Sequence, residues 1–469
     1  MPVHESKENK TGDSLDARSL VYARLSRQLL RYPDLAIEPV DTSGLSQREQ
    51  AFAKALEITT LTRWRTLEAV VSSRLKRPWQ DLEPKLRAAL LGGAAQLLFM
   101  DRIPDHAAVA ETVSWAKRSI RQGAGGMVNG VLRAITRLRK ETLPAEDPRA
   151  REWWEHRDII PLETGEALLL DEPVFSDDRL TRVGEQASLG NELLLGWVGA
   201  RGWACAQERA SHCLSRPPIF IHEPGSPSRP WEGSHAELVE LLESVPDARV
   251  QDPGSARAIM STSELEPRTI VDFCAGRGTK TRQLAELHPD AEIFATDVND
   301  ARLEDLRRTF EGHPRVHAVE PAGLRDVIGQ VDLLVLDVPC SNTGVLPRRP
   351  QARYRIDDER RASLARLQKE IVSETVNLLA PGAHLLYITC SIEPGENETI
   401  ARWIEKRYEV EVLTCRQLEP TGHPGGAREA YADGGFHALF AGRGSEEEPS
   451  EGSEPVPEDT GLDATDTLH

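Results

Sequence analysis

The sequence lacks the features of a membrane or secreted protein. No apolar run approaches the roughly 20 residues that a transmembrane helix needs, and the longest run, residues 88–100, is interrupted by Gln96 and two glycines. The polar opening MPVHESKENKTGDSLD has no hydrophobic stretch typical of a secretory signal. We therefore expect a protein that is located in the cytoplasm and has no membrane partner.

Metal-binding cysteine patterns are also missing. The chain of 469 residues has six cysteines, and none of them forms a Cys-x-x-Cys pair, so the spacing of a structural zinc site is absent. In a reducing cytosol most cysteines are small, buried, apolar residues, which is the first interpretation of all six. We expect no bound metal ion.

Acidic residues outnumber Lys and Arg, 75 to 57, but the charge is unevenly distributed. The formal net charge is −18, yet residues 444–469 carry nine acidic residues and no Lys or Arg, which leaves −9 for the rest of the chain. The total charge therefore does not exclude a nucleic-acid partner, because the local arrangement of cations decides such binding.

The hydrophobic pattern divides the chain into five segments. Residues 1–16 and the acidic tail 444–469 are polar, and we expect both to be disordered. Residues 17–140 repeat apolar residues at spacings of three and four, which predicts an all-helical domain. Residues 141–250 mix helical patches with SRPPIFIHEPGSPSRP, which predicts a linker and small subdomain with one edge strand at PPIFIH.

Residues 251–443 have the pattern of a doubly wound α/β domain. The short apolar runs TIVDFC, AEIFATDV, VDLLVLDV and AHLLYITCS alternate with helical segments at residues 280–287, 301–310 and 359–379. This alternation predicts a parallel, Rossmann-like sheet that is covered on both faces and binds ligands at the carboxyl ends of its strands.

A glycine-rich loop, VDFCAGRGTKT, follows the first of these strands. Gly276 and Gly278 allow a tight turn, and backbone N–H groups at the start of the next helix can face a polar ligand. About twenty residues later the second strand ends in Asp297, which can accept hydrogen bonds from two ribose hydroxyls. The combination favours a nucleoside cofactor over a plain turn, but it does not separate a dinucleotide from S-adenosylmethionine.

Two cysteines stand where later strands end. LDVPCSNTGV places Asp337 and Cys340 at one carboxyl end, and YITCSIEPGENE places Cys390 at another. A single cysteine at a strand end is usually structural. Two of them, each followed by serine and each facing the expected ligand crevice, favour chemistry over packing.

These motifs resemble those of the RsmB/Sun family of RNA 5-methylcytosine methyltransferases. The resemblance includes DVPCSNTGVL, ITCSIEPGENE, CAGRGTKT, VQDPGSARA and GGFHALF, and in the helical segment RWRTLE, ALLGGAAQLLFMDRIPDHAAVAETV and MVNGVLRA resemble a NusB-like domain. It implies a class I methyltransferase domain that uses S-adenosyl-L-methionine, preceded by a NusB-like RNA-binding domain and a small RNA-binding subdomain.

The resemblance also implies a role for each motif residue. Cys390 is the nucleophile that adds to carbon 6 of cytosine, Cys340 assists release of the product, and Asp337 holds the edge of the base. The residues implied to bind S-adenosyl-L-methionine are Cys274, Ala275, Gly276, Arg277, Gly278, Thr279, Lys280, Asp297, Glu320 and Asp337.

The cofactor loop departs from the family pattern CAAPGGKT. Gly276, Arg277 and Thr279 replace alanine, proline and glycine, and Glu320 stands where the family has the shorter aspartate. Proline restrains the loop and glycine permits close approach, so these departures predict an altered affinity for the cofactor.

A run of arginines after Cys340 is the predicted RNA contact. PRRPQARYRIDDERR contains Arg348, Arg349, Arg353, Arg355, Arg360 and Arg361, and Tyr354 could stack on a base. The alternative is a solvated, ion-paired helix start. Arg118, Arg121 and Arg133 in the helical segment either contact RNA or are ordinary surface charge.

The first hypothesis is a monomeric RNA (cytosine-5-)-methyltransferase that acts on small-subunit ribosomal RNA, with tRNA or another RNA as alternative substrate. A non-catalytic RNA-binding protein would not need paired thiols. A DNA 5-methylcytosine enzyme uses the Pro-Cys cysteine as nucleophile and does not require a second one. An NAD-dependent enzyme predicts no role for either thiol.

Overall fold

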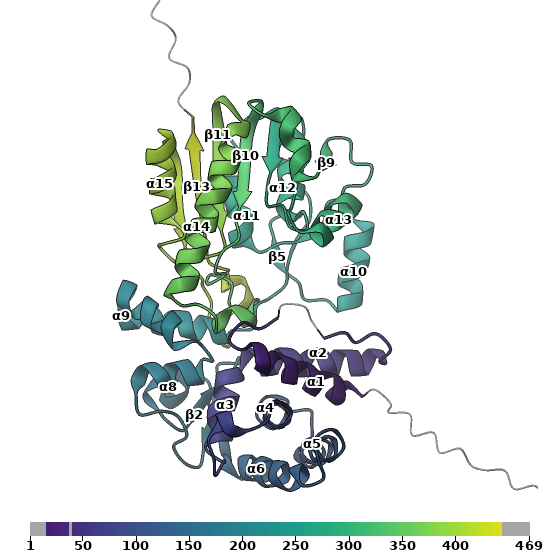
Figure 1. Cartoon of the computed structure of the whole chain (residues 1–469), viewed down its shortest axis with the longest axis vertical. Helices are drawn as coiled ribbons and strands as arrows, with labels where there is room; N and C mark the ends of the chain where they lie inside the picture. The colour runs from purple at the N-terminus through teal and green to yellow at the C-terminus, as the bar shows by residue number, and fades with distance from the viewer. Residues whose placement is uncertain (1–15, 37–39, 443–469) are drawn as a thin grey trace, which may run out of the picture.

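The computed structural model describes residues 16–36 and 40–442. The segments expected to be disordered, residues 1–16 and 444–469, lie outside this range except for Asp16. A helical part and a sheet-containing part lie one above the other, with α9 (Asn191–Leu214) beside their junction (Figure 1). Among the described residues, no helix combines the length and apolar character needed to cross a bilayer.

The first part is all-helical, as predicted. Its helices are α1 (Ala17–Arg31), α2 (Gln47–Thr62), α3 (Trp64–Ser72), α4 (Pro84–Phe99), α5 (Asp105–Ser119) and α6 (Ala124–Leu138). The residues of α4 are apolar almost all round, and the helix is buried among its neighbours (Figure 1). A Cβ on Gly92 would clash with the Tyr22 ring, so glycine is needed where α1 crosses α4.

The middle part contains two small antiparallel sheets. The first has the order β1-β3-β2, and the second has the order β5-β4-β6. The strands and helices are β1 (Arg139–Leu143), α7 (Pro148–Arg151), β2 (Ile159–Pro161), β3 (Ala167–Leu170), α8 (Arg179–Gln186), α9, β4 (Phe220–His222), β5 (Arg229–Pro230), α10 (His235–Ser244) and β6 (Arg249–Val250). The prediction of an edge strand at PPIFIH is wrong. β4 is the central strand of its sheet and pairs with both β5 and β6. The two prolines precede β4, so they remove no backbone N–H from this pairing.

The third part is the predicted doubly wound α/β domain. Its seven-stranded sheet has the order β12-β13-β11-β10-β7-β8-β9, in which β13 runs antiparallel to the other six strands. The strands are β7 (Thr269–Asp272), β8 (Glu292–Ala295), β9 (Val316–Ala318), β10 (Val331–Asp337), β11 (Leu379–Thr389), β12 (Glu411–Leu418) and β13 (Gly435–Ala441).

Two apolar clusters cover the two faces of this sheet. One cluster packs α11 (Pro253–Met260), α12 (Thr279–Leu287) and α13 (Asp300–Thr309), and the other packs α14 (Asp358–Thr375) and α15 (Glu398–Tyr408). A sheet covered on both faces leaves its strand ends as the place for ligands.

A buried arginine joins the three parts. Arg353 is 0% exposed, and its guanidinium donates to the carbonyls of Thr62 at 3.1 Å, of Leu346 at 3.4 Å, and of Cys213. Thr62 ends α2 and Cys213 is in the last turn of α9. Carbonyls at helix C-termini lack partners within the helix and carry the negative end of its dipole. One cation therefore satisfies carbonyls from three separate segments.

Replacing Arg353 by methionine is expected to destabilise the junction, because it leaves buried carbonyls without donors. Each such group costs about 1–3 kcal/mol, so we expect the melting temperature to fall by about 4 °C or more in a calorimetric scan. Arg349→Met, an exposed neighbour, should melt like the wild type. An unchanged melting temperature in Arg353→Met would contradict this role.

Candidate active site

Two thiols meet at the edge of the sheet where β10 and β11 end. These strands are parallel neighbours with Asp337 opposite Ile388, so Cys340 and Cys390 follow them on the same edge. The two Sγ atoms lie 3.0 Å apart. Asn342 has a φ of 62°, which brings its side-chain oxygen to 3.3 Å from the Cys390 thiol. The structure thus brings together the two cysteines predicted to act in one reaction.

The two thiols are not equivalent. Cys340 is buried, whereas Cys390 is partly exposed and lines a cavity. The hydrogen bond with Cys390, together with burial, raises the pKa of the Cys340 thiol well above its usual range. Cys340 therefore keeps its proton at neutral pH. An accessible thiol beside a protonated one suits a pair in which one sulfur adds to a substrate and the other handles a proton.

An ion pair lines the same cavity. The Lys280 Nζ donates to Asp337 Oδ2 at 2.8 Å, and both side chains face the cavity that Cys390 lines. Burial disfavours the ammonium, but the charge and hydrogen bond of Asp337, together with smaller contributions from Cys390 and Asp272, outweigh it, and the pKa of Lys280 is raised. A fixed donor and a fixed acceptor beside a thiol can hold the polar edge of a base.

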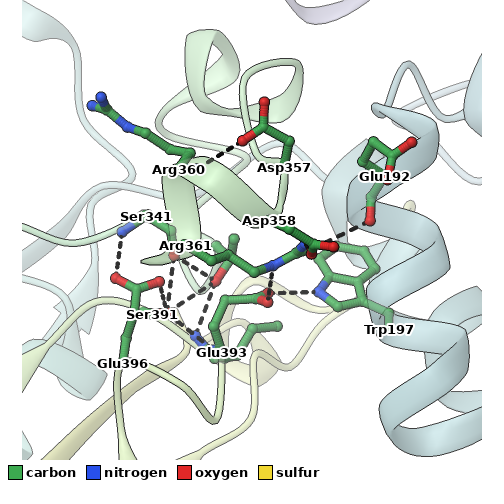
Figure 2. Close-up of polar contacts among 12 residues, drawn as sticks. Glu192, Trp197, Ser341, Asp357, Asp358, Arg360, Arg361, Ser391, Glu393 and Glu396 are labelled. Carbon is green, nitrogen blue, oxygen red and sulfur yellow. Dashed lines mark hydrogen bonds and ion pairs between the residues drawn. The ribbon is translucent and has the colours of Figure 1, made fainter. Parts of the chain in front are cut away.

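A buried carboxyl group connects the two cysteine loops (Figure 2). Glu396 is 0% exposed. One of its oxygens accepts from the Ser341 N–H at 2.8 Å and from Gln368 at 3.0 Å, and the other accepts from the Ser391 hydroxyl at 3.0 Å. Ser341 and Ser391 directly follow the two cysteines. Sequence reasoning assigned no role to Glu396, although it stands in the motif ITCSIEPGENE.

The loop between β7 and α12 has the shape that its glycines predict. Gly276 and Gly278 have φ of +61° and +86°, a region that glycine adopts without strain. The Gly276 N–H donates to Asp297 Oδ2 at 3.1 Å, which orients this carboxylate at the end of β8. A Cβ on Gly276 would meet nothing within 4 Å. An oriented carboxylate beside an open, glycine-lined turn fits a nucleoside.

The remaining predicted cofactor residues differ in orientation. The Arg277 side chain is 81% exposed and pairs with Asp305 at 3.3 Å, so only its backbone faces the loop interior. Glu320, after β9, is 68% exposed and pairs with Arg307 at 3.3 Å. Burial raises the pKa of Cys274, which therefore stays a neutral thiol. Ala275 and Thr279 belong to the turn and to the start of α12.

The residues predicted to contact RNA are buried, ion-paired, or without an ion pair. Arg353 and Tyr354 are buried in the junction, where the Tyr354 hydroxyl donates to the Leu61 carbonyl at 2.6 Å. The prediction that these two residues contact RNA is therefore corrected, because neither presents a polar group to solvent.

The other members of the arginine run are exposed to different degrees. Arg348 pairs with Asp252 and Asp433, and Arg361 pairs with Asp358 and Glu393. Within the described residues, the side chains of Arg349, Arg355 and Arg360 form no ion pair, and the Arg355 Nε has no hydrogen-bond partner. In the helical part, Arg118 and Arg121 are ion-paired and Arg133 bonds to Asn129, which favours ordinary surface charge for these three.

Two family models match the chain. Residues 260–436 match the model of the 16S rRNA methyltransferases RsmB/F, and residues 25–137 match that of the NusB family. A ribosomal RNA small subunit methyltransferase B from Xanthomonas campestris pv. campestris is 29% identical over 430 residues, covering 84% of this chain and 86% of the relative. One from Cronobacter sakazakii is 27% identical over 467 residues, covering 91% of this chain and 99% of the relative.

A solved structure extends the similarity to the fold. The crystal structure of PH0851 superposes with a TM-score of 0.63 at 18% identity, covering 91% of this chain and 99% of the other. At this identity the similarity concerns the fold alone.

The role of Glu396 is testable with two substitutions. Glu396→Leu removes every acceptor and leaves the buried Ser341 N–H unpaired, at a cost of about 1–3 kcal/mol. We expect a lower melting temperature and loss of activity. Glu396→Gln should retain most of both, because the amide oxygen can accept from Ser341 while the amide nitrogen donates to Ser391. Equal behaviour of the two variants would show that the carboxyl group does not hold the loops.

Proposed function

Because the chain belongs to the RsmB/F family of methyltransferases, with a NusB-family domain in front, we propose that it methylates carbon 5 of a cytosine in small-subunit ribosomal RNA. The observation that carries this proposal is the approach of the Cys340 and Cys390 thiols to 3.0 Å. The names of the curated relatives support the choice of RNA.

Addition of Cys390 to carbon 6 of the base begins the proposed reaction. Carbon 5 of cytosine is a poor nucleophile, and a thiolate on carbon 6 makes the ring enamine-like. Asp337 and Lys280 hold the polar edge of the base beside Cys390. When bound, S-adenosyl-L-methionine supplies the electrophilic methyl group. The turn at Gly276 and Gly278 would hold it through backbone N–H groups, with Asp297 at the ribose and Glu320 toward the adenine.

Release of the product is the proposed task of Cys340. The carbon-5 proton must leave and the bond between carbon 6 and Cys390 must break. Cys340 carries a proton and lies 3.0 Å from Cys390, so it can pass this proton to the departing sulfur. A thiol with a raised pKa is also the stronger base once it is deprotonated, so the Cys340 sulfur can accept the carbon-5 proton in exchange.

The unpaired arginines are the proposed RNA phosphate contacts. Burial, and then the positive charge of Arg360, lower the pKa of Arg355. Cations without a protein partner are available to phosphates, which position RNA without reading its sequence. We assign phosphate contacts to Arg349, Arg355 and Arg360.

We further propose a monomeric, cytoplasmic enzyme with domains at residues 17–140, 141–250 and 251–443. The helices α1 to α6 fill the first of these ranges, and the seven-stranded sheet lies within the last.

Cysteine variants test the proposed function. With labelled S-adenosyl-L-methionine and small-subunit ribosomal RNA, Cys390→Ala is expected to transfer at least about a thousandfold more slowly than wild type. Cys340→Ala should accumulate a protein–RNA adduct that resists denaturant, because addition succeeds and release fails. Cys415→Ala, an exposed cysteine on β12, should behave as wild type. An adduct in Cys390→Ala, or transfer to tRNA in place of ribosomal RNA, would contradict the proposal.

Salt dependence tests the phosphate contacts. Arg349→Gln and Arg355→Gln should each raise the KM for RNA and reduce the slope of log affinity against log salt by about 0.7. The kcat should change little. Arg402→Gln, an exposed residue on α15, is the matched control. If both variants have the same slope of log affinity against log salt as the wild type, these arginines do not contact RNA phosphates.

A further inference from the structure

The loop after Cys390 is attached on its outer side to α9, a helix outside the methyltransferase sheet. Glu393 is 5% exposed. Its Oε1 accepts from the Trp197 indole N–H at 3.1 Å, and its Oε2 accepts from the Arg361 Nε at 2.9 Å (Figure 2). Glu393 is three residues from Cys390 and Trp197 lies on α9, so two hydrogen bonds connect the helix and α14 to this loop.

The same helix is fixed to the segment that follows the other cysteine. The Gly190 N–H, at the start of α9, donates to the Arg353 carbonyl at 2.9 Å. The Arg353 guanidinium donates to the Cys213 carbonyl in the last turn of α9. Both ends of α9 are therefore held by the segment after Cys340, while Trp197 near its first turns reaches the loop after Cys390.

Ile392 of the Cys390 loop packs in the same apolar cluster as Leu193 and Trp197 of α9. Beside this contact lies a pocket of about 230 Å³, lined by Gly196, Pro394 and Arg361 among others. Apolar packing is not directional, so the hydrogen bonds to Glu393 orient the loop. A buried carboxylate that loses one of two donors is left with an underpaired charge, so either loss is expected to move Glu393.

We propose that Trp197 and Arg361 are positioning residues, which act through Glu393 to hold Cys390 where it attacks the base. This inference rests on the proposed function and names how α9 serves the same site. Glu396 holds the loop from the inner side, and Glu393 holds it from the outer side. Displacement of a reacting atom by about 1 Å lowers a rate by up to about a hundredfold.

Trp197→Phe keeps an aromatic ring and removes the indole N–H, but it also removes part of a ring that packs in an apolar cluster, so Glu393→Gln, which keeps the size of the side chain, is tested beside it. We expect kcat to fall between about tenfold and a hundredfold, with the KM values for RNA and S-adenosyl-L-methionine within twofold of wild type. Trp203→Phe makes the same change just beyond the kink of α9 at Gly202, at a ring that packs against Arg179, and it should leave kcat unchanged. Glu393→Gln should lower kcat similarly, and the double variant should fall no further than either single one.

A second measurement needs no RNA. Iodoacetamide alkylates accessible thiols, and peptide mass spectrometry gives the rate at Cys390. We expect faster alkylation of Cys390 in Trp197→Phe and in Arg361→Gln, a rate near that of wild type in Trp203→Phe, and partial recovery in Arg361→Lys. If Trp197→Phe does not fold, Glu393→Gln carries the same comparison.

The outcomes are distinguishable. Wild-type kcat together with wild-type alkylation in Trp197→Phe and Glu393→Gln would overturn the inference, as would a change confined to KM. Absence of methyl transfer by the wild-type protein would instead overturn the proposed function, whereas the alkylation rates would still report on the position of the loop.

Discussion

The guanidinium of Arg353 is fully buried, and the carbonyls that it meets belong to α2, to α9 and to the turn after Cys340. A buried cation is costly unless its donors are used, so the three segments must keep the geometry that satisfies it. Arg63 lies close by and donates to the Pro161 carbonyl at 2.9 Å. Burial, and then the charge of Arg353, lower the pKa of Arg63 to about 10. Two neighbouring cations are tolerated only where carbonyls surround them, which restricts how the helical part and the sheet can meet.

The candidate active site depends on this junction. The loops that carry Cys340 and Cys390 follow different strands, so contacts outside the sheet must hold them in place relative to each other. The sheet places Cys340 and Cys390 on one edge, but the approach of their sulfur atoms also requires that the loops after them be fixed. Glu396 connects the loops directly, and α9 contacts both through Arg353 and Glu393. The proposed reaction then depends on the different surroundings of the two cysteine side chains. Cys340 is buried and protonated, while Cys390 faces the cavity with Lys280 and Asp337.

The sequence predicts the strand ends well, because apolar runs and glycine-rich turns are local features. The helix expected at residues 280–287 is α12 (Thr279–Leu287), and Gly276 and Gly278 adopt the positive φ that their positions suggest. The cysteine pair was predicted from family motifs and from the edge on which parallel strands end. Gly276, a departure from the family alanine, has a φ of +61° that a side chain would strain.

Long-range burial of polar residues was not predictable in the same way. Arg353 and Tyr354 stand in a run of arginines that suits RNA, yet their partners Thr62 and Leu61 are about 290 positions away in the chain. Nothing local distinguishes a buried arginine from an exposed one. The same holds for Glu393 and Glu396, whose partners lie on α9, α14 and the loop after β10.

The central claim is that Cys390 attacks the base and that Cys340 serves release. A small-subunit ribosomal RNA fragment containing 5-fluorocytidine tests it in the wild-type protein, because fluorine replaces the carbon-5 proton that must leave and the covalent intermediate then persists. Digestion and mass spectrometry of the trapped complex identify the attached residue. The account predicts a methylated fluorocytidine on the peptide that contains Cys390. Attachment to Cys340, or a stable adduct with neither cysteine, would contradict it.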